Sequence, residues 1–303
     1  GTPALAARLR GAWLGLALGD ALGAGKPRTR GGKPAALEWT QHTALALCTI
    51  ESLLTAGRYD ARDQIDRFVR WQREGEGSST GAPPATGAVT PDVARALATY
   101  LWRGLPTAGS HDPADLSPNS LPRVIAAAAF ACADPAGAVA LAAECSRTTH
   151  QSPTILDACR LYGAMLVAGL RGQPAAEWLS GMPETVQTCW DARPLHKDAR
   201  ALVAPSSGVV ASAPRPGTVL HAIAEVRRLA LAGGSFEDGL AAARRCAKGE
   251  ATLYGALFGT VYGLMHGEAA LPTDARERLA GLARLEDVAA RCVTRARAAG
   301  LAA

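Results

Sequence analysis

"LEWTQHTALALCTIESLL", residues 37–54, has the apolar spacing of an amphipathic helix. Its apolar stripe consists of Leu45, Ile50, Leu53 and Leu54. Thr40 stands where an N-cap is expected, so the predicted helix begins there and carries Gln41 and His42 at its tip. An amide and an imidazole at this position raise the question of what the tip binds.

The same period of about 3.6 residues recurs along the whole chain, while strand alternation is almost absent. Helices are predicted at 4–24, 40–56, 60–74, 90–103, 120–133, 135–147, 154–171, 218–232, 236–247, 250–266, 274–283 and 285–299. The breaks between them are rich in Gly, Pro and Ser, and none is a long polar linker. We therefore expect an all-α protein without a sheet, folded as one domain over residues 1–303.

The charge of the chain argues against a polyanion-binding surface. Its 32 Lys and Arg residues are interspersed with 27 Asp and Glu residues, which leaves a formal net charge of +5 and no basic run. No nucleic-acid partner is expected. A mildly basic pocket for a phosphate-bearing ligand is still compatible with this composition.

The cysteines and the apolar segments indicate a cytoplasmic protein. Seven cysteines occur singly, without a CxxC pair, and are expected to be reduced thiols. The apolar stretch "WLGLALGDALGA" is short and is interrupted by Asp20, so we do not interpret it as a signal segment. No stretch reaches the roughly 20 apolar residues of a membrane span, and no membrane association is expected.

Six motifs in a fixed order resemble the ADP-ribosylglycohydrolase family: "GAWLGLALGDALGA", "WTQHTALALCTIESLL", "REGEGSSTG", "SPNSLPRVIAAAAFA", "SRTTHQSPTILDACRLYGAML" and "GEATLYGALFGTVYGL". The resemblance covers nearly the whole chain. It implies a single-domain orthogonal helical bundle with a cleft for ADP-ribose and two Mg²⁺ or Mn²⁺ ions.

The positions that the resemblance assigns to metal ligands carry other residues here. Where active members have Trp-Thr-Asp-Asp-Thr, this chain has "WTQHT" at 39–43. Pro27 is nearest to the place of a family glutamate, and Ala85 aligns with the aspartate of an Asp-Ile-Gly motif. "CAKG" at 246–249 replaces an Asp-x-Asp-Thr motif.

These replacements predict that no metal pair binds. Mg²⁺ and Mn²⁺ require oxygen ligands and several carboxylates to offset two dications, whereas Gln41 offers one neutral oxygen and Lys248 adds positive charge. A zinc site made of His42 and Cys246 would lack a third ligand. We predict no metal and no cofactor, and a pocket that accepts an anion beside His42 and Lys248.

The remaining motif residues are candidates for ligand binding at helix N-termini and turns. The predicted set is Thr40, Gln41, His42, Ser79, Thr80, Gly81, Asn119, Ser120, His150 and Lys248. For several of them a structural role is the alternative, and His150 could equally be a hydrogen-bonded histidine at a helix entry. Asp20 is interpreted as a carboxylate that binds backbone N–H groups.

Three functional hypotheses follow. The first is a pseudoenzyme that binds an ADP-ribosyl group, another nucleotide-like ligand or an ADP-ribosylated protein without cleaving it. The second is a repurposed, metal-independent hydrolase or lyase acting on an N-glycosidic or guanidine-bearing substrate, with His42, Glu250 and Lys248 as candidate catalytic residues. The third is a purely structural protein. The first is preferred, because glycosidic hydrolysis needs carboxylates or metals to stabilise its transition state.

Overall fold

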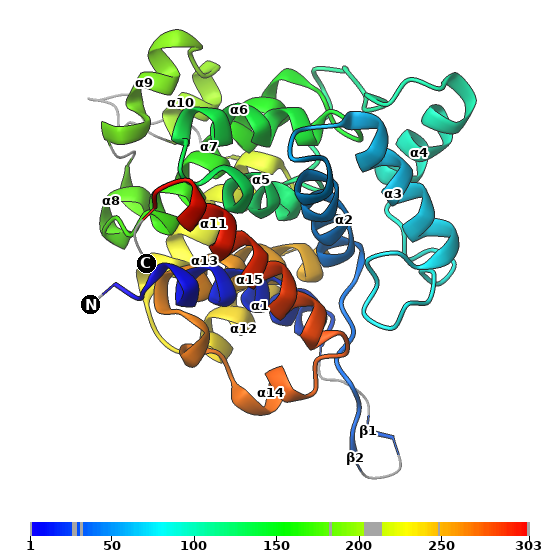
Figure 1. Ribbon diagram of the computed structural model, residues 1–303, viewed down its shortest axis with the longest axis vertical. Helices are drawn as coiled ribbons and strands as arrows, with labels where there is room; N and C mark the ends of the chain where they lie inside the picture. Colours follow the sequence, from blue (N-terminus) through cyan, green and yellow to red (C-terminus); the bar gives the residue numbers. More distant parts are fainter. Residues whose placement is uncertain are drawn as a thin grey trace.

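Helices account for almost all regular structure in the computed structural model (Figure 1), which describes residues 2–25, 29–30, 33–181, 184–202, 214–247 and 249–301. The longer helices are α1 (Leu5–Gly23), α2 (Gln41–Ala56), α3 (Ala61–Glu74), α4 (Pro91–Arg103), α5 (Val124–Ala131), α6 (Pro135–Ser146), α7 (Pro153–Leu170), α11 (Val219–Ala232), α12 (Phe236–Cys246), α13 (Ala251–His266) and α15 (Leu282–Ala298). The shorter ones are α8 (Ala175–Ser180), α9 (Glu184–Ala192), α10 (Lys197–Ala201), α14 (Thr273–Glu277) and the 3₁₀ turns η1 (Leu121–Arg123) and η2 (Glu268–Ala270). The all-α prediction is confirmed.

Three details differ from the sequence prediction. A two-residue antiparallel ribbon, β1 (Thr29–Arg30) with β2 (Lys33–Pro34), projects from the helical body, where no sheet was expected (Figure 1). Helices α8, α9 and α10 fall where no helix was predicted. The segment predicted as one helix over 274–283 forms only the short α14 and a turn before α15.

Helices α1 and α13 lie side by side in the centre of the fold and touch through their backbones (Figure 1). Facing glycines make this possible, in the pairs Gly11–Gly263, Gly15–Gly259 and Gly19–Gly255. A methyl group added at Gly15 would lie 2.0 Å from the carbonyl oxygen of Gly259, well inside any allowed contact. The contact brings the C-terminal end of α1, with Asp20, beside the N-terminal end of α13.

The apolar core is one contiguous cluster that extends from Leu5 in α1 to Ala296 in α15. Residues 11–20 of α1 are all buried, so this helix is covered on every side. A single core is what the single-domain prediction requires, and that prediction remains to be tested by unfolding. Within the described residues, no helix is both long enough and apolar enough to cross a membrane.

Candidate functional site

Asp20 fixes the start of α2. Its Oδ2 atom accepts hydrogen bonds from the backbone N–H groups of Thr40 (3.0 Å) and Thr43 (3.1 Å) and from the Thr43 hydroxyl (2.8 Å). Its Oδ1 atom accepts from the Thr40 hydroxyl at 2.6 Å. The interpretation of Asp20 as a carboxylate that binds backbone N–H groups is therefore confirmed. Thr40 stands at the N-cap, but its hydroxyl donates to Asp20 and does not cap the helix.

Gln41 joins the start of α2 to the start of α4. Its Nε2 atom donates to the Thr90 hydroxyl at 2.9 Å, and its Oε1 atom accepts from the Thr90 backbone N–H at 2.9 Å. The Thr90 hydroxyl in turn donates to Asp92 at 2.5 Å. Both ends of the Gln41 amide are thus used inside the protein, and the side chain is buried.

Asp92, at the N-terminus of α4, is the centre of a polar cluster. Its Oδ1 atom accepts from the Thr90 hydroxyl and from the backbone N–H of Val93. Its Oδ2 atom accepts from the Ser117 hydroxyl (2.5 Å) and the Asn119 amide (2.8 Å), and lies 2.8 Å from Nε2 of His150. We call Asp92, Thr90, Ser117, Asn119 and His150 the Asp92 cluster.

The electrostatics of the Asp92 cluster favour the ionised carboxylate. Burial by itself would raise the pKa of Asp92, but the hydrogen bond and charge of His150, with the Ser117 and Thr90 hydroxyls, hold this pKa far below its usual range. Asp92 is therefore an anion in the folded protein at neutral pH.

His150 and Arg123 support the cluster from the interior. The Nδ1 atom of His150 lies 2.7 Å from the Thr149 hydroxyl, so both ring nitrogens have partners inside the protein. Thr149 also accepts a 2.6 Å hydrogen bond from the Arg123 guanidinium, which is buried and further bonded to the carbonyl oxygens of Cys145 and Ser146. Burial lowers the pKa of Arg123.

The Arg123 guanidinium keeps its buried Nη1 atom without a hydrogen-bond partner, and His42 and Glu250 each keep one such atom as well. These atoms are Nδ1 of His42 and Oε2 of Glu250, the latter at the N-cap of α13. Burial lowers the pKa of His42, against the opposing charges of Asp20 and Asp92. Burial, with a contribution from Asp92, raises the pKa of Glu250. His42, Glu250 and Arg123 thus each have unused hydrogen-bonding capacity in this region.

The other predicted ligand residues are divided between this region and its surroundings. Asn119 belongs to the Asp92 cluster, whereas Ser120 is fully buried and bonds the Ser146 hydroxyl at 2.8 Å. The turn with Ser79, Thr80 and Gly81 lies beside Trp39 of the α2 entry, with Gly81 exposed at a φ of 75°. The Thr80 hydroxyl accepts a hydrogen bond from the Ala82 backbone N–H of its own turn at 3.4 Å.

Ala85 and Cys246 are two further positions that were expected to have lost metal ligands. Ala85 is exposed in a loop, and Cys246 lies 3.5 Å from the Arg228 guanidinium on the α11–α12 side. Lys248 and Pro27 lie outside the described residues, so the anion predicted beside Lys248 stays a prediction. Within the described part of the chain, no three His, Cys, Asp or Glu side chains are grouped so as to hold a metal ion.

Sequence reasoning missed Asp92, which adds a carboxylate to a region expected to be mainly cationic. The available signal was weak, since "TPD" at 90–92 reads as an ordinary helix start with an acidic first turn. Only the fold brings this turn beside His150, 58 residues later in the chain.

Comparison with known proteins identifies the fold and its lineage. The sequence model of the ADP-ribosylglycohydrolase family matches residues 1–301. The chain belongs to the ADP-ribosylglycohydrolase family. A solved structure described as an ADP-ribosylglycohydrolase-related protein complex superimposes with a TM-score of 0.75 at 28% identity, covering 96% of this chain and 98% of the other.

Two curated relatives of this ADP-ribosylglycohydrolase family chain are named ADP-ribosylarginine hydrolase Tri1. The one from Pseudomonas putida (strain GB-1) is 32% identical over 186 residues, which cover 57% of this chain and 49% of the relative. The one from Serratia proteamaculans (strain 568) is 33% identical over 172 residues, which cover 52% and 46%. The matched region thus spans about half the length of either relative.

Proposed function

We propose that this ADP-ribosylglycohydrolase family member binds an ADP-ribosyl or similar nucleotide-bearing group without metal-dependent hydrolysis. The observation that carries the proposal is the saturation of the two carboxylates nearest to the α2 entry. Asp92 has five hydrogen-bond partners and Asp20 accepts four hydrogen bonds, all from the protein itself.

Saturation matters because a carboxylate offers about four acceptor positions, which a metal ion would have to share with these donors. Gln41 is held at both ends by Thr90, so its oxygen is not free either. Two divalent ions would also need several anionic oxygens as ligands. His42 provides a nitrogen, and Glu250 provides one free carboxyl, which is too few. We infer that the residues present do not fit the binuclear metal group that the resemblance implies.

Ligand binding is supported by two separate features, the unused groups of His42 and Glu250 and a cavity that these two residues do not line. His42 and Glu250 each keep a free polar atom, which a ribose hydroxyl or an amide of a ligand would satisfy. A cavity of about 540 Å³ lies next to the loop that carries Ser117 and is lined by Leu116, Thr154 and Val219 among others. This size is in the range of small-molecule pockets. The names of the curated relatives make an ADP-ribosylated arginine, free or on a protein, the first ligand to test.

The experiment is a thermal-shift and calorimetric titration with ADP-ribose and ADP, each in EDTA and in Mn²⁺. Binding to the native state must raise the melting temperature, and we expect the same rise in both buffers. Glu250→Gln and His42→Ala should weaken binding, while Glu237→Gln, a change of an exposed first-turn acid in α12, should not. Manganese-dependent binding or Mn²⁺-stimulated release of ADP-ribose from ADP-ribosylated arginine would contradict the proposal.

Metal-independent hydrolysis is a second candidate, supported by the free carboxyl of Glu250. A half-buried carboxyl with a raised pKa has the protonation behaviour of a general acid. This candidate predicts slow release of ADP-ribose that EDTA does not affect and that Glu250→Gln abolishes. If the wild type releases no ADP-ribose, hydrolysis is excluded and binding is the only one of the two proposed functions that is left.

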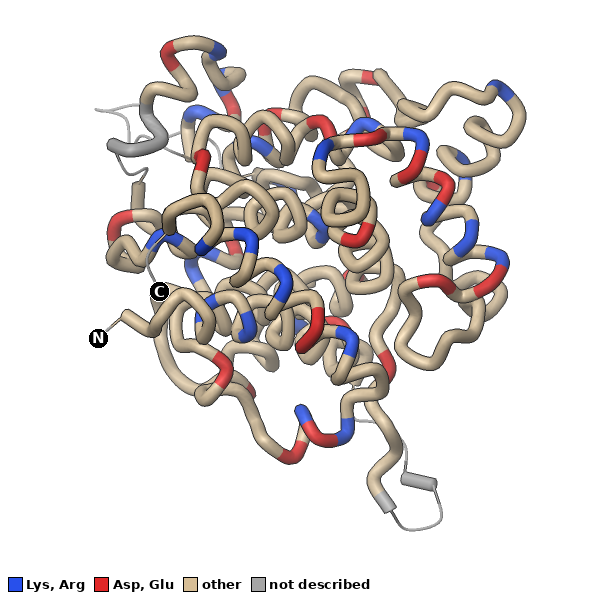
Figure 2. The backbone as a smooth tube through the Cα atoms, in the orientation of Figure 1, with Lys and Arg blue, Asp and Glu red and all other residues tan. Residues whose placement is uncertain are grey.

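The location and partners that we propose follow from the chemistry of the surface and the thiols. All seven cysteines are free, and five of them are buried, as suits the reducing cytoplasm. In the view of Figure 2, basic and acidic residues are intermixed. We therefore propose a nucleotide-like small molecule or an ADP-ribosylated protein as the partner, and neither a nucleic acid nor a membrane.

A further inference from the structure

A groove of about 390 Å³ runs along α4, on the side of Asp92 that faces the loop 105–111. One wall is a single stripe of α4, made of Asp92, Arg95, Ala96, Thr99 and Arg103. The stripe covers eleven residue steps, or about 16 Å at 1.5 Å per residue. The groove therefore leads from the Asp92 cluster to the outer end of α4.

The second wall, the loop 105–111, is held by hydrogen bonds from Gln151. Gln151 donates from its amide to the carbonyl oxygens of Thr107 (2.9 Å) and Gly109 (2.7 Å), and its backbone N–H donates to Ser110. Gly109 is close to the chain behind it, because an added Cβ would lie 2.4 Å from the His150 nitrogen. A wall held at this many points is preformed for a ligand, which lowers the entropic cost of binding.

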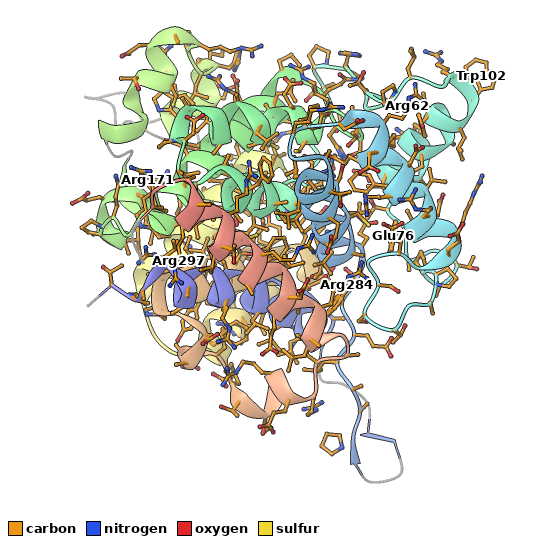
Figure 3. The ribbon with its side chains drawn as sticks, in the orientation of Figure 1. Arg62, Glu76, Trp102, Arg171, Arg284 and Arg297 are labelled. Atoms are coloured by element: carbon orange, nitrogen blue, oxygen red, sulfur yellow. The ribbon has the colours of Figure 1, made fainter. Side chains whose placement is uncertain are left out.

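Exposed apolar side chains that the core does not use lie at the C-terminal end of α4, where Leu105 lines the groove and Leu101 and Trp102 stand outside its lining. The fractional exposures are 79% for Trp102, 62% for Leu105 and 48% for Leu101, whereas the buried face of α4 is formed by other residues. Figure 3 shows Trp102 pointing away from the body of the protein. Arg103 stacks on the Trp102 ring at 5.0 Å. A cluster of exposed Trp, Leu and Arg is typical of a protein contact surface.

The free hydrogen-bonding capacity of the groove consists mainly of donors. Arg95, Arg103 and His111 form no ion pair or hydrogen bond within the described residues. Of the carboxylates that line the same groove, Asp92 is used in its cluster, and Asp115 accepts one hydrogen bond, from the Ser117 backbone N–H at 3.0 Å. Guanidinium groups in this state favour carboxylates of a partner.

The spacing of the two arginines selects the conformation of that partner. Arg95 and Arg103 are eight residues apart on α4, or about 12 Å along the helix axis. In an extended chain, residues four apart are about 13 Å apart and point to the same side. We propose that the α4 groove binds an extended, acidic segment of another protein, with two carboxylates four residues apart on Arg95 and Arg103 and an apolar residue on Leu105 and Trp102.

A nucleic acid or polyphosphate fits the groove less well. A continuous line of phosphates would have to pass Asp92 and Asp115, and it would leave Leu105 without an apolar partner. In contrast, the proposed peptide segment carries negative charge at two positions only, opposite Arg95 and Arg103.

The test is fluorescence anisotropy with labelled synthetic peptides and the full chain. The first peptide has two aspartates four residues apart followed by a leucine. The second has the same composition with the aspartates three apart, so they point to opposite sides. We expect the first to bind at least about fivefold more tightly than the second.

Matched variants identify the surface. The double variant Arg95→Ala, Arg103→Ala should lower the affinity for the first peptide by roughly tenfold or more, and Trp102→Ala should lower it by about fivefold. Arg73→Ala removes an exposed arginine at the end of α3 and should leave binding unchanged. Circular dichroism should show that all variants are folded.

Three results would overturn the inference: no binding of the first peptide at millimolar concentration, equal affinity for both spacings, or tighter binding of a polyphosphate or a thymidine oligonucleotide than of the first peptide. None of these results depends on ADP-ribose binding, so this test and that of the proposed function fail separately.

Discussion

The substitution Gly15→Ala tests the backbone contact between α1 and α13. Its new methyl group would lie 2.0 Å from the carbonyl oxygen and 2.7 Å from the carbonyl carbon of Gly259. Both neighbours are backbone atoms, so no side chain can rotate away, and the two helices must move apart by about 1 Å or more. The movement would loosen the packing along the length of both helices.

The magnitude follows from two opposing effects. Overpacking a well-filled core costs typically about 1 to 3 kcal/mol, and more when the structure cannot relax locally. Alanine in place of glycine inside a helix stabilises the folded state by up to about 1 kcal/mol, because alanine has the higher helix propensity. Because both clashing atoms are backbone, we place the overpacking cost above the usual range, at about 4 kcal/mol. The expected net loss in the free energy of unfolding is then about 3 kcal/mol, and the melting temperature should fall by roughly 5 to 10 °C.

The assay is urea unfolding and thermal melting of wild type, Gly15→Ala and the control Gly181→Ala. An added Cβ at Gly181 meets only the Glu177 carbonyl oxygen, at 3.7 Å, and the φ there is −150°, which any residue adopts. The control should remain within about 0.5 kcal/mol of wild type. If Gly15→Ala is as stable as the control, the close contact of α1 with α13 is wrong.

Three further results are expected. Asp92→Asn should destabilise the protein by about 2 to 4 kcal/mol at neutral pH. Because the folded pKa of Asp92 is depressed, its contribution is present above the unfolded pKa of about 3.9 and is lost as pH falls below it. Urea unfolding at successive pH values should therefore show the variant's deficit shrinking in acid, and a constant deficit would contradict this. His42 has a lowered pKa in the folded state, so wild type should lose stability as pH falls below about 6.5, and His42→Gln should lose less. An equal loss in both proteins would exclude His42 as the cause. Metal analysis after purification in Mn²⁺ should find well below one equivalent, and EDTA should not change the melting temperature. Two tightly bound ions would disprove the inference that the residues of the site do not fit a pair of metal ions.

The long helices and the α2 entry could be predicted from sequence, because an apolar stripe over three or more turns has a clear period. The ends of α2 and α3 agree with prediction to within a residue. Helices α8, α9 and α10 have five to nine residues, too few to show that period. Their form depends on packing against the larger helices.

The candidate site was only partly predictable. The tip with Gln41 and His42, and the turn with His150, carry recognisable motifs, and the structure brings Gln41 and His150 into one network through Thr90 and Asp92. Asp92 could not be assigned, because the loop before α4 has no period that fixes its register. Which glycines of α1 face which glycines of α13 likewise depends on tertiary packing alone.

The pairing of α1 with α13 also has a consequence for synthesis on the ribosome. The two helices are roughly 240 residues apart in sequence, and residues 11–20 of α1 have no exposed face in the folded protein. At a synthesis rate of about 5 to 20 residues per second, α13 is completed between about 10 and 50 s after α1. During that time an apolar helix without its partner is exposed to other nascent chains. Expression of this protein should therefore depend on chaperones that shield the N-terminal segment, more than its final stability would suggest.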